Sequence, residues 1–163
     1  MLIALAILGL IAGFVVPKVL AVVDEQVQRA AYKETYAMVQ ELAYNRAMSV
    51  DPTEIKANFL QYLKTHSDYK EFSPSGAHHP HGLHIWEYFY YKNGSKLLLY
   101  SHTPYDQIII YSAVNEPLFV SRFFVNTGRV AYPCGASCST PRLVKPGDIA
   151  PTHGDNDYLK VFK

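Results

Sequence analysis

Four histidines stand close together near the middle of the chain and are the strongest candidate for metal chemistry. His78, His79, His81 and His84 fall within seven residues. Imidazole is the commonest protein ligand for transition metals, so the cluster predicts a site for Zn, Ni or Cu. A proline and a glycine interrupt the cluster, and no Asp or Cys lies within it to complete a ligand set. The alternative interpretation is a polar surface loop.

Two cysteines form the second candidate. Cys134 and Cys138 enclose three residues. In an oxidising compartment this pair favours a disulfide, which would stabilise a local turn by about 2 kcal/mol. Two free thiols and a metal site are the alternatives, although the spacing is not that of a zinc knuckle and the chain has no second cysteine pair.

Tyrosine is the third enriched residue type, with thirteen in the chain. We expect most of the six tyrosines between residues 88 and 111 to be strand residues, with the ring on the core and the hydroxyl at the surface; a carbohydrate-binding or adhesive surface is the alternative. The densest stretch contains Tyr88, Tyr90, Tyr91, Tyr100, Tyr105 and Tyr111. The sequence lacks a nucleophile elbow, a phosphate loop, an HExxH motif and carboxylates paired at a catalytic spacing. We therefore predict neither an enzyme nor a cofactor.

Composition narrows the class of protein further. The 163 residues suit one globular domain with one appended segment. Charged residues make up 18%, against about 25% in typical soluble proteins. The formal net charge is only +1, so no nucleic-acid partner is indicated.

The appended segment is the apolar N-terminal run. Met1 to Val16 contain no charged or polar side chain. As a helix with a rise of about 1.5 Å per residue, this run is shorter than the hydrocarbon core of about 30 Å, and counting through Val23 restores the length. The long stem of Lys18 can carry its charge to an interface. We therefore predict a transmembrane helix over residues 1–23; a cleaved signal peptide, a generic anchor and a buried core helix are the alternatives.

Helical signals continue beyond this segment. Residues 24–49 are predicted to form an amphipathic helix that continues from the apolar segment. The pattern behind it begins at Lys18, with apolar positions that recur at intervals of three, four or seven. These positions are Leu20, Val23, Val27, Ala31, Met38 and Leu42. A shorter helix is predicted over 52–66, because Asp51 can cap it and Pro52 is tolerated at its first position. Residues 67–83 lack periodicity and predict a loop.

The period then changes to that of strands. Residues 84–132 predict four or five short antiparallel strands, over 85–92, 96–101, 107–114, 118–125 and 129–132. Asn93 and Gly94 separate the first two strands and are the strongest short-range hairpin signal. Residues 133–163 are rich in Pro, Gly and Ser and predict a loop. Helices followed by an antiparallel meander predict an α+β fold, with residues 24–163 forming one head domain.

The N-terminal run also carries a family resemblance. The sequence MLIALAILGLIAGFVVP is similar to the N-terminal helix of type IV pilins and of the pseudopilins of type II secretion and competence systems. Gly9, Ala12 and Pro17 fall where that family has a glycine, an alanine and a helix-loosening proline. The segment 123–130 resembles the closing hairpin of some minor pseudopilins. The resemblance implies the pilin fold, in which the long helix packs on the antiparallel sheet.

The chain departs from the family at its start. The family has a basic leader ending in glycine, and then a phenylalanine-led stretch ending in glutamate, before the position of Met1. These residues are absent, so we expect that the sequence begins inside a mature stalk. The alternative is a true start at Met1, which prepilin peptidase would not recognise.

The resemblance implies a structural subunit of a type IV pilus or pseudopilus. Its expected partners are other pilin subunits, prepilin peptidase, the assembly platform and, before assembly, the cytoplasmic membrane of a prokaryote. The head would lie outside the cytoplasm, and the assembled filament would be periplasmic or at the cell surface. The alternative function is a single-pass anchored binding module that uses the histidine cluster or the tyrosines.

Overall fold

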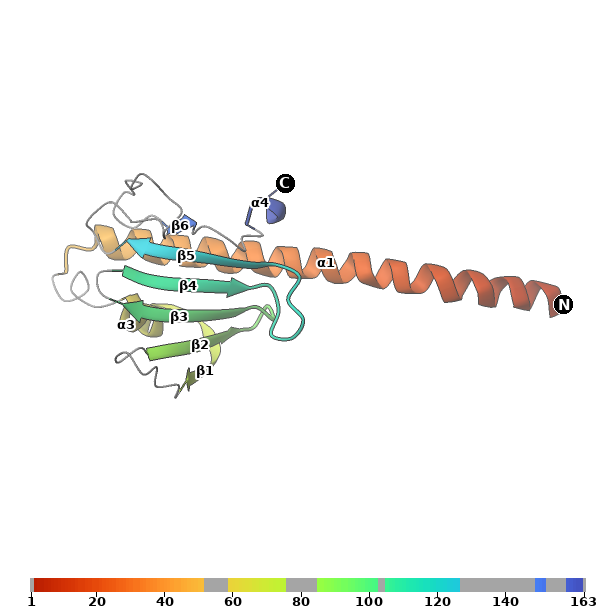
Figure 1. The fold of residues 1–163 in the computed structure, drawn as a ribbon, viewed down its shortest axis with the longest axis horizontal. Helices are drawn as coiled ribbons and strands as arrows, with labels where there is room; N and C mark the ends of the chain where they lie inside the picture. The colour runs from red at the N-terminus through yellow and green to blue at the C-terminus, as the bar shows by residue number, and fades with distance from the viewer. Residues whose placement is uncertain are drawn as a thin grey trace, which may run out of the picture.

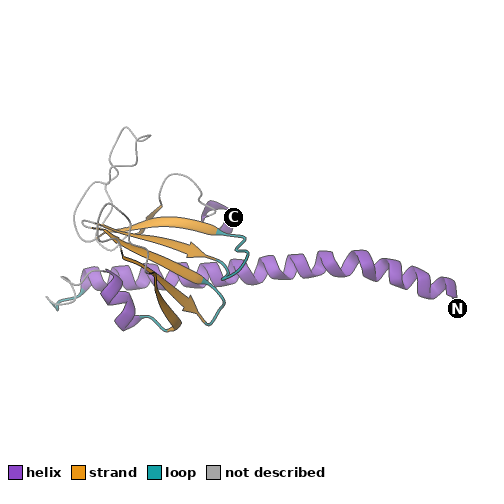
Figure 2. Cartoon of the chain, turned by 60° about the horizontal axis from the view of Figure 1, so that its bottom comes forward, coloured by secondary structure: helices purple, strands orange, loops and turns teal. Residues whose placement is uncertain are grey.

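The computed structural model of the chain describes residues 2–51, 59–75, 85–102, 105–126, 149–151 and 158–162, with α1 side chains from Leu8 onward. Helix α1 (Leu2–Met48) runs through Pro17 without a break, and its N-terminal part projects beyond the sheet (Figure 1). Its C-terminal part lies across one face of an antiparallel sheet (Figure 2). The predicted α+β class is therefore confirmed.

The sheet is a meander of six strands in the order β1-β2-β3-β4-β5-β6. The first five strands have seven residues each and the sixth has three. Their bounds are β1 Tyr69–Ser75, β2 Ile85–Tyr91, β3 Lys96–His102, β4 Tyr105–Tyr111, β5 Val120–Asn126 and β6 Ile149–Pro151. Two short helices complete the described structure, α3 (Phe59–His66) and α4 (Tyr158–Val161).

The β2–β3 hairpin forms at the predicted Asn93-Gly94 signal. Gly94 has a φ of 86°, in the left-handed region that glycine adopts without steric cost. The Asn93 side chain accepts a hydrogen bond from the Ser95 amide at 3.0 Å and donates one to the Ala31 carbonyl at 3.3 Å. The turn is therefore closed locally and attached to α1.

The predicted loops require correction at both edges of the sheet. Strand β1 lies within the predicted loop 67–83, and β6 and α4 lie within the predicted loop 133–163. Both strands are edge strands of the described sheet, and each contains a proline, Pro74 or Pro151. Proline weakens a strand signal, yet an edge strand tolerates it because one row of its backbone groups is unpaired. The predicted strand at 129–132 lies outside the described residues.

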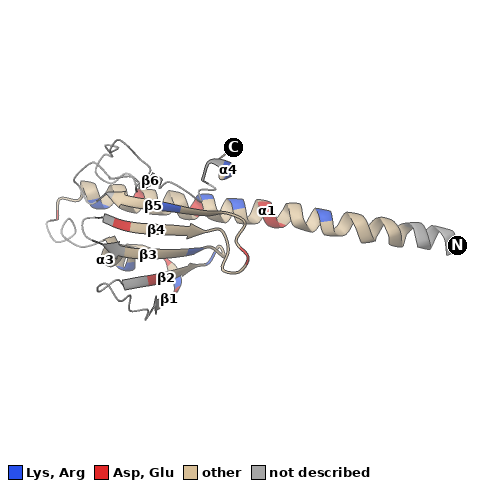
Figure 3. Cartoon of the chain, in the orientation of Figure 1, with Lys and Arg blue, Asp and Glu red and all other residues tan. Residues whose placement is uncertain are grey.

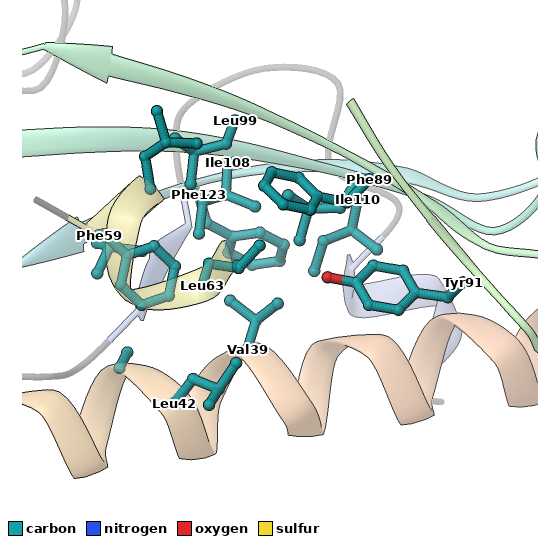
Figure 4. Packing of buried hydrophobic residues seen from close by; sticks show 14 of the residues in the cluster. Val39, Leu42, Phe59, Leu63, Phe89, Tyr91, Leu99, Ile108, Ile110 and Phe123 are labelled. Atoms are coloured by element: carbon teal, nitrogen blue, oxygen red, sulfur yellow. The ribbon is translucent and has the colours of Figure 1, made fainter. Parts of the chain in front are cut away.

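The core lies between the sheet, α1 and α3 (Figure 4). Its fully buried side chains include Tyr32 and Val39 of α1, Phe59 and Leu63 of α3, and Phe89, Leu97, Leu99, Ile108, Ile110, Phe123 and Val125 of the sheet. Helix α3 ends at His66, as the predicted helix 52–66 does, while residues 52–58 lie outside the described part.

The buried face of α1 differs from the predicted apolar stripe. Val27, a member of that stripe, is 58% exposed, whereas its neighbour Gln28 is 7% exposed. The face that packs on the head consists of Gln28, Ala31, Tyr32, Thr35, Val39, Leu42, Ala43 and Arg46. Three of these residues are polar and find partners inside the head, so apolarity alone misplaces the face.

Candidate functional site

The part of α1 that projects from the head is the main candidate functional surface. We call residues 8–27 the stalk. Each of its large apolar side chains is between 49% and 67% exposed. They are Leu8, Leu10, Ile11, Phe14, Val15, Val16, Val19, Leu20, Val22, Val23 and Val27. Successive helical positions differ by about 100°, so runs such as 14–16 place apolar groups on every side of the helix. The stalk therefore has apolar surface around its whole circumference.

The predicted assembly residues all lie in this helix. A methyl group built at Gly9 or at Gly13 would meet nothing within 4 Å, so packing within the chain does not require either glycine. Ala12 and Pro17 are exposed. A glycine inside a helix costs about 1 kcal/mol relative to alanine. No contact within the described chain offsets that cost.

Charge is sparse along the stalk and is concentrated toward the head (Figure 3). Lys18 is exposed and has no ion-pair partner among the described residues. Asp24 accepts a hydrogen bond from the Gln28 amide at 3.0 Å but pairs with no cation in that same part of the chain. Glu25 forms an ion pair with Arg29 at 2.9 Å. The stalk thus has one unpaired cation and one unpaired anion.

Gln28 marks the end of the stalk because it joins α1 to the β4–β5 loop. Its Oε1 accepts hydrogen bonds from the Ser112 hydroxyl at 2.7 Å and from the Leu118 amide at 2.8 Å. The Ser112 hydroxyl in turn accepts one from the Phe119 amide at 3.0 Å. One buried amide side chain therefore holds the loop against the helix.

Arg29 forms a second connection at the same level. Its Nη1 donates to the carbonyls of Lys160 and Val161 at 2.7 and 2.9 Å, so it binds the C-terminal end of α4. Its guanidinium also lies 5.0 Å from the centre of the Phe119 ring. Residues 28 and 29 together fix the base of the head on the stalk.

Replacing Gln28 is expected to destabilise the head more than replacing the apolar residue beside it. Gln28→Leu leaves one buried donor, the Ser112 hydroxyl, and one part-buried donor, the Leu118 amide, without this acceptor and should lower the free energy of unfolding by about 2 kcal/mol. Val27→Ala serves as the matched control and should change it by less than about 0.5 kcal/mol, because the Val27 side chain is 58% exposed and lies outside the core cluster. Denaturant unfolding of the full chain in detergent micelles measures both. Equal effects of the two substitutions would contradict this account of the junction.

The tyrosines divide between the two faces of the sheet. Tyr91 is buried in the core, while Tyr88, Tyr90, Tyr100 and Tyr111 alternate with core residues and lie half-buried on the opposite face. The expectation that most rings face the core is therefore wrong, because strand alternation gives those positions to Phe and aliphatic residues. The side chain of Tyr105 lies outside the part of the chain that the structure describes.

The outer face combines tyrosine rings with one lysine. The rings of Tyr88 and Tyr90 stack with centroids 6.4 Å apart. The Lys96 ammonium lies 5.6 Å from the ring centre of Tyr88 and 4.6 Å from that of Tyr111. Burial, and then the neighbouring Tyr88, raise the pKa of Tyr111. A role for this face in carbohydrate binding stays a prediction.

A cleft of about 400 Å³ lies between α1, the end of α3 and the β2–β3 hairpin. Its lining combines Glu34, Thr35, Met38, His66, Ser67, Asp68, Tyr91, Lys92 and Asn93. The hydroxyl oxygens of Ser67 and Tyr91 are buried, and neither has a hydrogen-bond partner of good geometry among the described residues. Asp68 and Lys92 pair at 3.0 Å at the surface. The cleft therefore combines polar and apolar surface, and its lining carries two carboxylates, Glu34 and Asp68, and one lysine, Lys92.

The buried Tyr91 hydroxyl should make the head less stable at alkaline pH. Burial raises its pKa from 10.0 to about 12, so the folded state favours the neutral phenol. This contribution is fully present below pH 10 and is lost as the pH rises toward 12, a loss of about 2 to 3 kcal/mol. Tyr91→Phe should remove that component while changing stability at pH 7 by less than about 1 kcal/mol. Parallel pH-unfolding curves for the two proteins between pH 9 and 12 would contradict the assignment.

Other sites predicted from sequence fall where the structure gives no description. His78, His79, His81 and His84 lie outside the described residues, and so do Cys134 and Cys138. Across the described ranges, no group of three or more His, Cys, Asp or Glu side chains could hold a metal ion. The metal site and the disulfide therefore stay predictions.

Comparisons with protein-family models, with curated proteins and with solved structures found no match. Within the described residues, no helix combines the length and the hydropathy of a membrane span.

The junction formed by Gln28 and Arg29 was not predicted from sequence. The only signals in the sequence were the four-residue spacings of Asp24 to Gln28 and of Glu25 to Arg29.

Proposed function

We propose that this chain is a structural subunit of a type IV pilus or pseudopilus, and that its stalk is the assembly element. The observation that carries the proposal is the circumferential apolar surface of residues 8–27. A helix that is apolar on all sides is stable only when all sides are covered. A single partner helix covers one side, whereas lipid or a bundle of several stalks covers them all.

The driving force for assembly would be the exchange of one apolar environment for another. Before assembly the stalk sits in the cytoplasmic membrane, and afterwards it packs among the stalks of neighbouring subunits. Association in an apolar environment depends on close packing rather than on the hydrophobic effect. Gly9 and Ala12 would permit close approach, and this would account for a glycine that no contact in the described part of the chain requires.

The resemblance of the N-terminal run to pilins supplies the remaining parts of the proposal. The head lies outside the cytoplasm of a prokaryotic cell, where Cys134 and Cys138 would form a disulfide. Prepilin peptidase and an assembly platform act on the subunit, by analogy with the family. The head, attached to the stalk at residues 28 and 29, then lines the outside of the filament.

The proposal is tested by shearing filaments from cells that express the natural protein. Mass spectrometry of the sheared and of the membrane fractions should find the chain in both, with an excess in filaments for a major subunit and a trace for a minor one. If the chain occurs only in membranes and its heads stay monomeric, the filament proposal is wrong. That result would favour an anchored binding module.

A further inference from the structure

The unpaired lysine of the stalk poses an electrostatic problem for any assembly that buries it. Lys18 lies within the apolar stalk and is exposed in the isolated chain, with no ion-pair partner among the described residues. An ammonium group enclosed by aliphatic side chains is strongly unfavourable unless an anion lies beside it. If neighbouring stalks surround Lys18, one of them must therefore supply a carboxylate.

Two carboxylates are available farther along the helix, at Asp24 and Glu25 (Figure 3). They lie six and seven residues from Lys18, which corresponds to about 9 and 10 Å along the axis, too far for a contact within the same helix. Glu25 already pairs with Arg29 at 2.9 Å. The Asp24 carboxylate accepts only an amide hydrogen bond from Gln28 in the described chain. Asp24 is therefore the better acceptor for a further cation.

The positions of the two carboxylates around the axis of α1 also favour Asp24. Seven residues rotate a helix by nearly two full turns, so Glu25 lies about 20° from Lys18 on the same side, while Asp24 lies about 120° away. Subunits that polymerise head to tail use two different faces, one for each neighbour. A donor and an acceptor on separate faces can therefore extend such a polymer, whereas a pair on one face cannot.

We propose that Lys18 of one subunit pairs with Asp24 of an adjacent, parallel copy of this chain, and that this pair sets the axial offset between the two stalks at about 9 Å. The inference rests on the proposed function, because it requires stalks in contact. The pair neutralises the one free cation of the stalk at the point where the neighbouring helix would otherwise present aliphatic groups. It also fixes register, which a uniform apolar surface does not.

The experiment uses filaments sheared from cells, a zero-length carbodiimide cross-linker and three variants. Asp24→Asn keeps the acceptor for the Gln28 amide but removes the charge, and Glu25→Gln is the matched neutralisation one residue away. We expect Asp24→Asn to lower filament yield at least about tenfold and Glu25→Gln to change it less than about twofold. The charge swap Lys18→Asp with Asp24→Lys should restore most of the loss. Peptide mapping of wild-type filaments should recover a Lys18–Asp24 cross-link between copies.

The outcomes separate this inference from the proposed function. Filaments that contain the chain, lack the cross-link and tolerate Asp24→Asn would overturn the pairing while leaving the filament role intact. A chain that never enters filaments would overturn both. Thermal unfolding of the head serves as the folding control for Asp24→Asn, which keeps the acceptor for the Gln28 amide and should not shift the unfolding temperature.

Discussion

Asp106→Asn is expected to lower the free energy of unfolding by about 3 to 5 kcal/mol, because it removes the carboxylate that pairs with the buried Arg46 guanidinium in the described part of the head. The two side chains are only 5% and 4% exposed, and Nη1 of Arg46 lies 3.9 Å from Oδ2 of Asp106. Burial lowers the pKa of Arg46, and the Asp106 carboxylate opposes that shift. The positive charge of Arg46 is therefore stabilised mainly by the Asp106 carboxylate.

The substitution isolates charge because asparagine keeps the shape and one acceptor of aspartate. Oδ2 of Asp106 also accepts a hydrogen bond from the Phe59 amide at 3.0 Å, at the first residue of α3, and asparagine can preserve it. Unfolding of the full chain in detergent can be followed by the fluorescence of Trp86, the single tryptophan. The double variant Arg46→Met with Asp106→Asn should recover most of the loss, since a buried ion pair and its apolar replacement are often equally stable. A loss below about 1 kcal/mol for Asp106→Asn would contradict this account.

Phe14→Glu is expected to reduce the amount of chain in filaments at least about 100-fold, which corresponds to about 2.7 kcal/mol. Burial of a phenylalanine stabilises an assembly by about 1.5 to 3 kcal/mol, and this is lost in the variant. The new carboxylate can pair with Lys18 four residues along, yet the desolvation of both charges in an apolar bundle adds a further penalty. Phe14 is 67% exposed, the most exposed large apolar side chain of the stalk. Because Phe14 lies outside the core cluster of the head, its replacement should change the free energy of unfolding of the head by less than about 0.5 kcal/mol.

Gln61→Glu is the matched control, because it introduces the same charge on the exposed side of α3. It should leave filament yield within about twofold of wild type. The membrane fraction must be measured for both variants, so that failed insertion is distinguished from failed assembly. Normal filament yield for Phe14→Glu would show that this part of the stalk is not buried on assembly.

Much of the fold follows from local patterns. The apolar run predicts the N-terminal helix, Asn93 and Gly94 predict the hairpin, and the β-branched and aromatic runs predict strands β2 to β5. The edge strands could not be predicted in this way. YKEFSPS has the length of the central strands but is mostly polar and contains proline, while IAP has only three residues and also contains proline. Their pairing depends on long-range contacts that local propensity does not contain.

The location of the exposed apolar stalk was predicted from the sequence, but the residue at which it ends was not. Sequence placed the exposed apolar surface in the first helix, yet it assigned Val27 to the buried face and overlooked Gln28. That error has a physical cause, because a buried amide side chain with three hydrogen-bonding partners has the composition of a surface residue. The same reasoning applies to Arg46, whose burial becomes favourable only once Asp106 of β4 lies beside it.

The central claim is that the stalk is buried by other stalks, and a reconstruction of sheared filaments at side-chain resolution tests it most directly. We predict parallel stalks at the filament centre, with residues 8–27 of each enclosed by those of its neighbours and the heads outside. Contacting stalks should be offset so that Lys18 of one faces Asp24 of the next. Filaments held together by head contacts alone, with stalks that do not touch, would contradict the account.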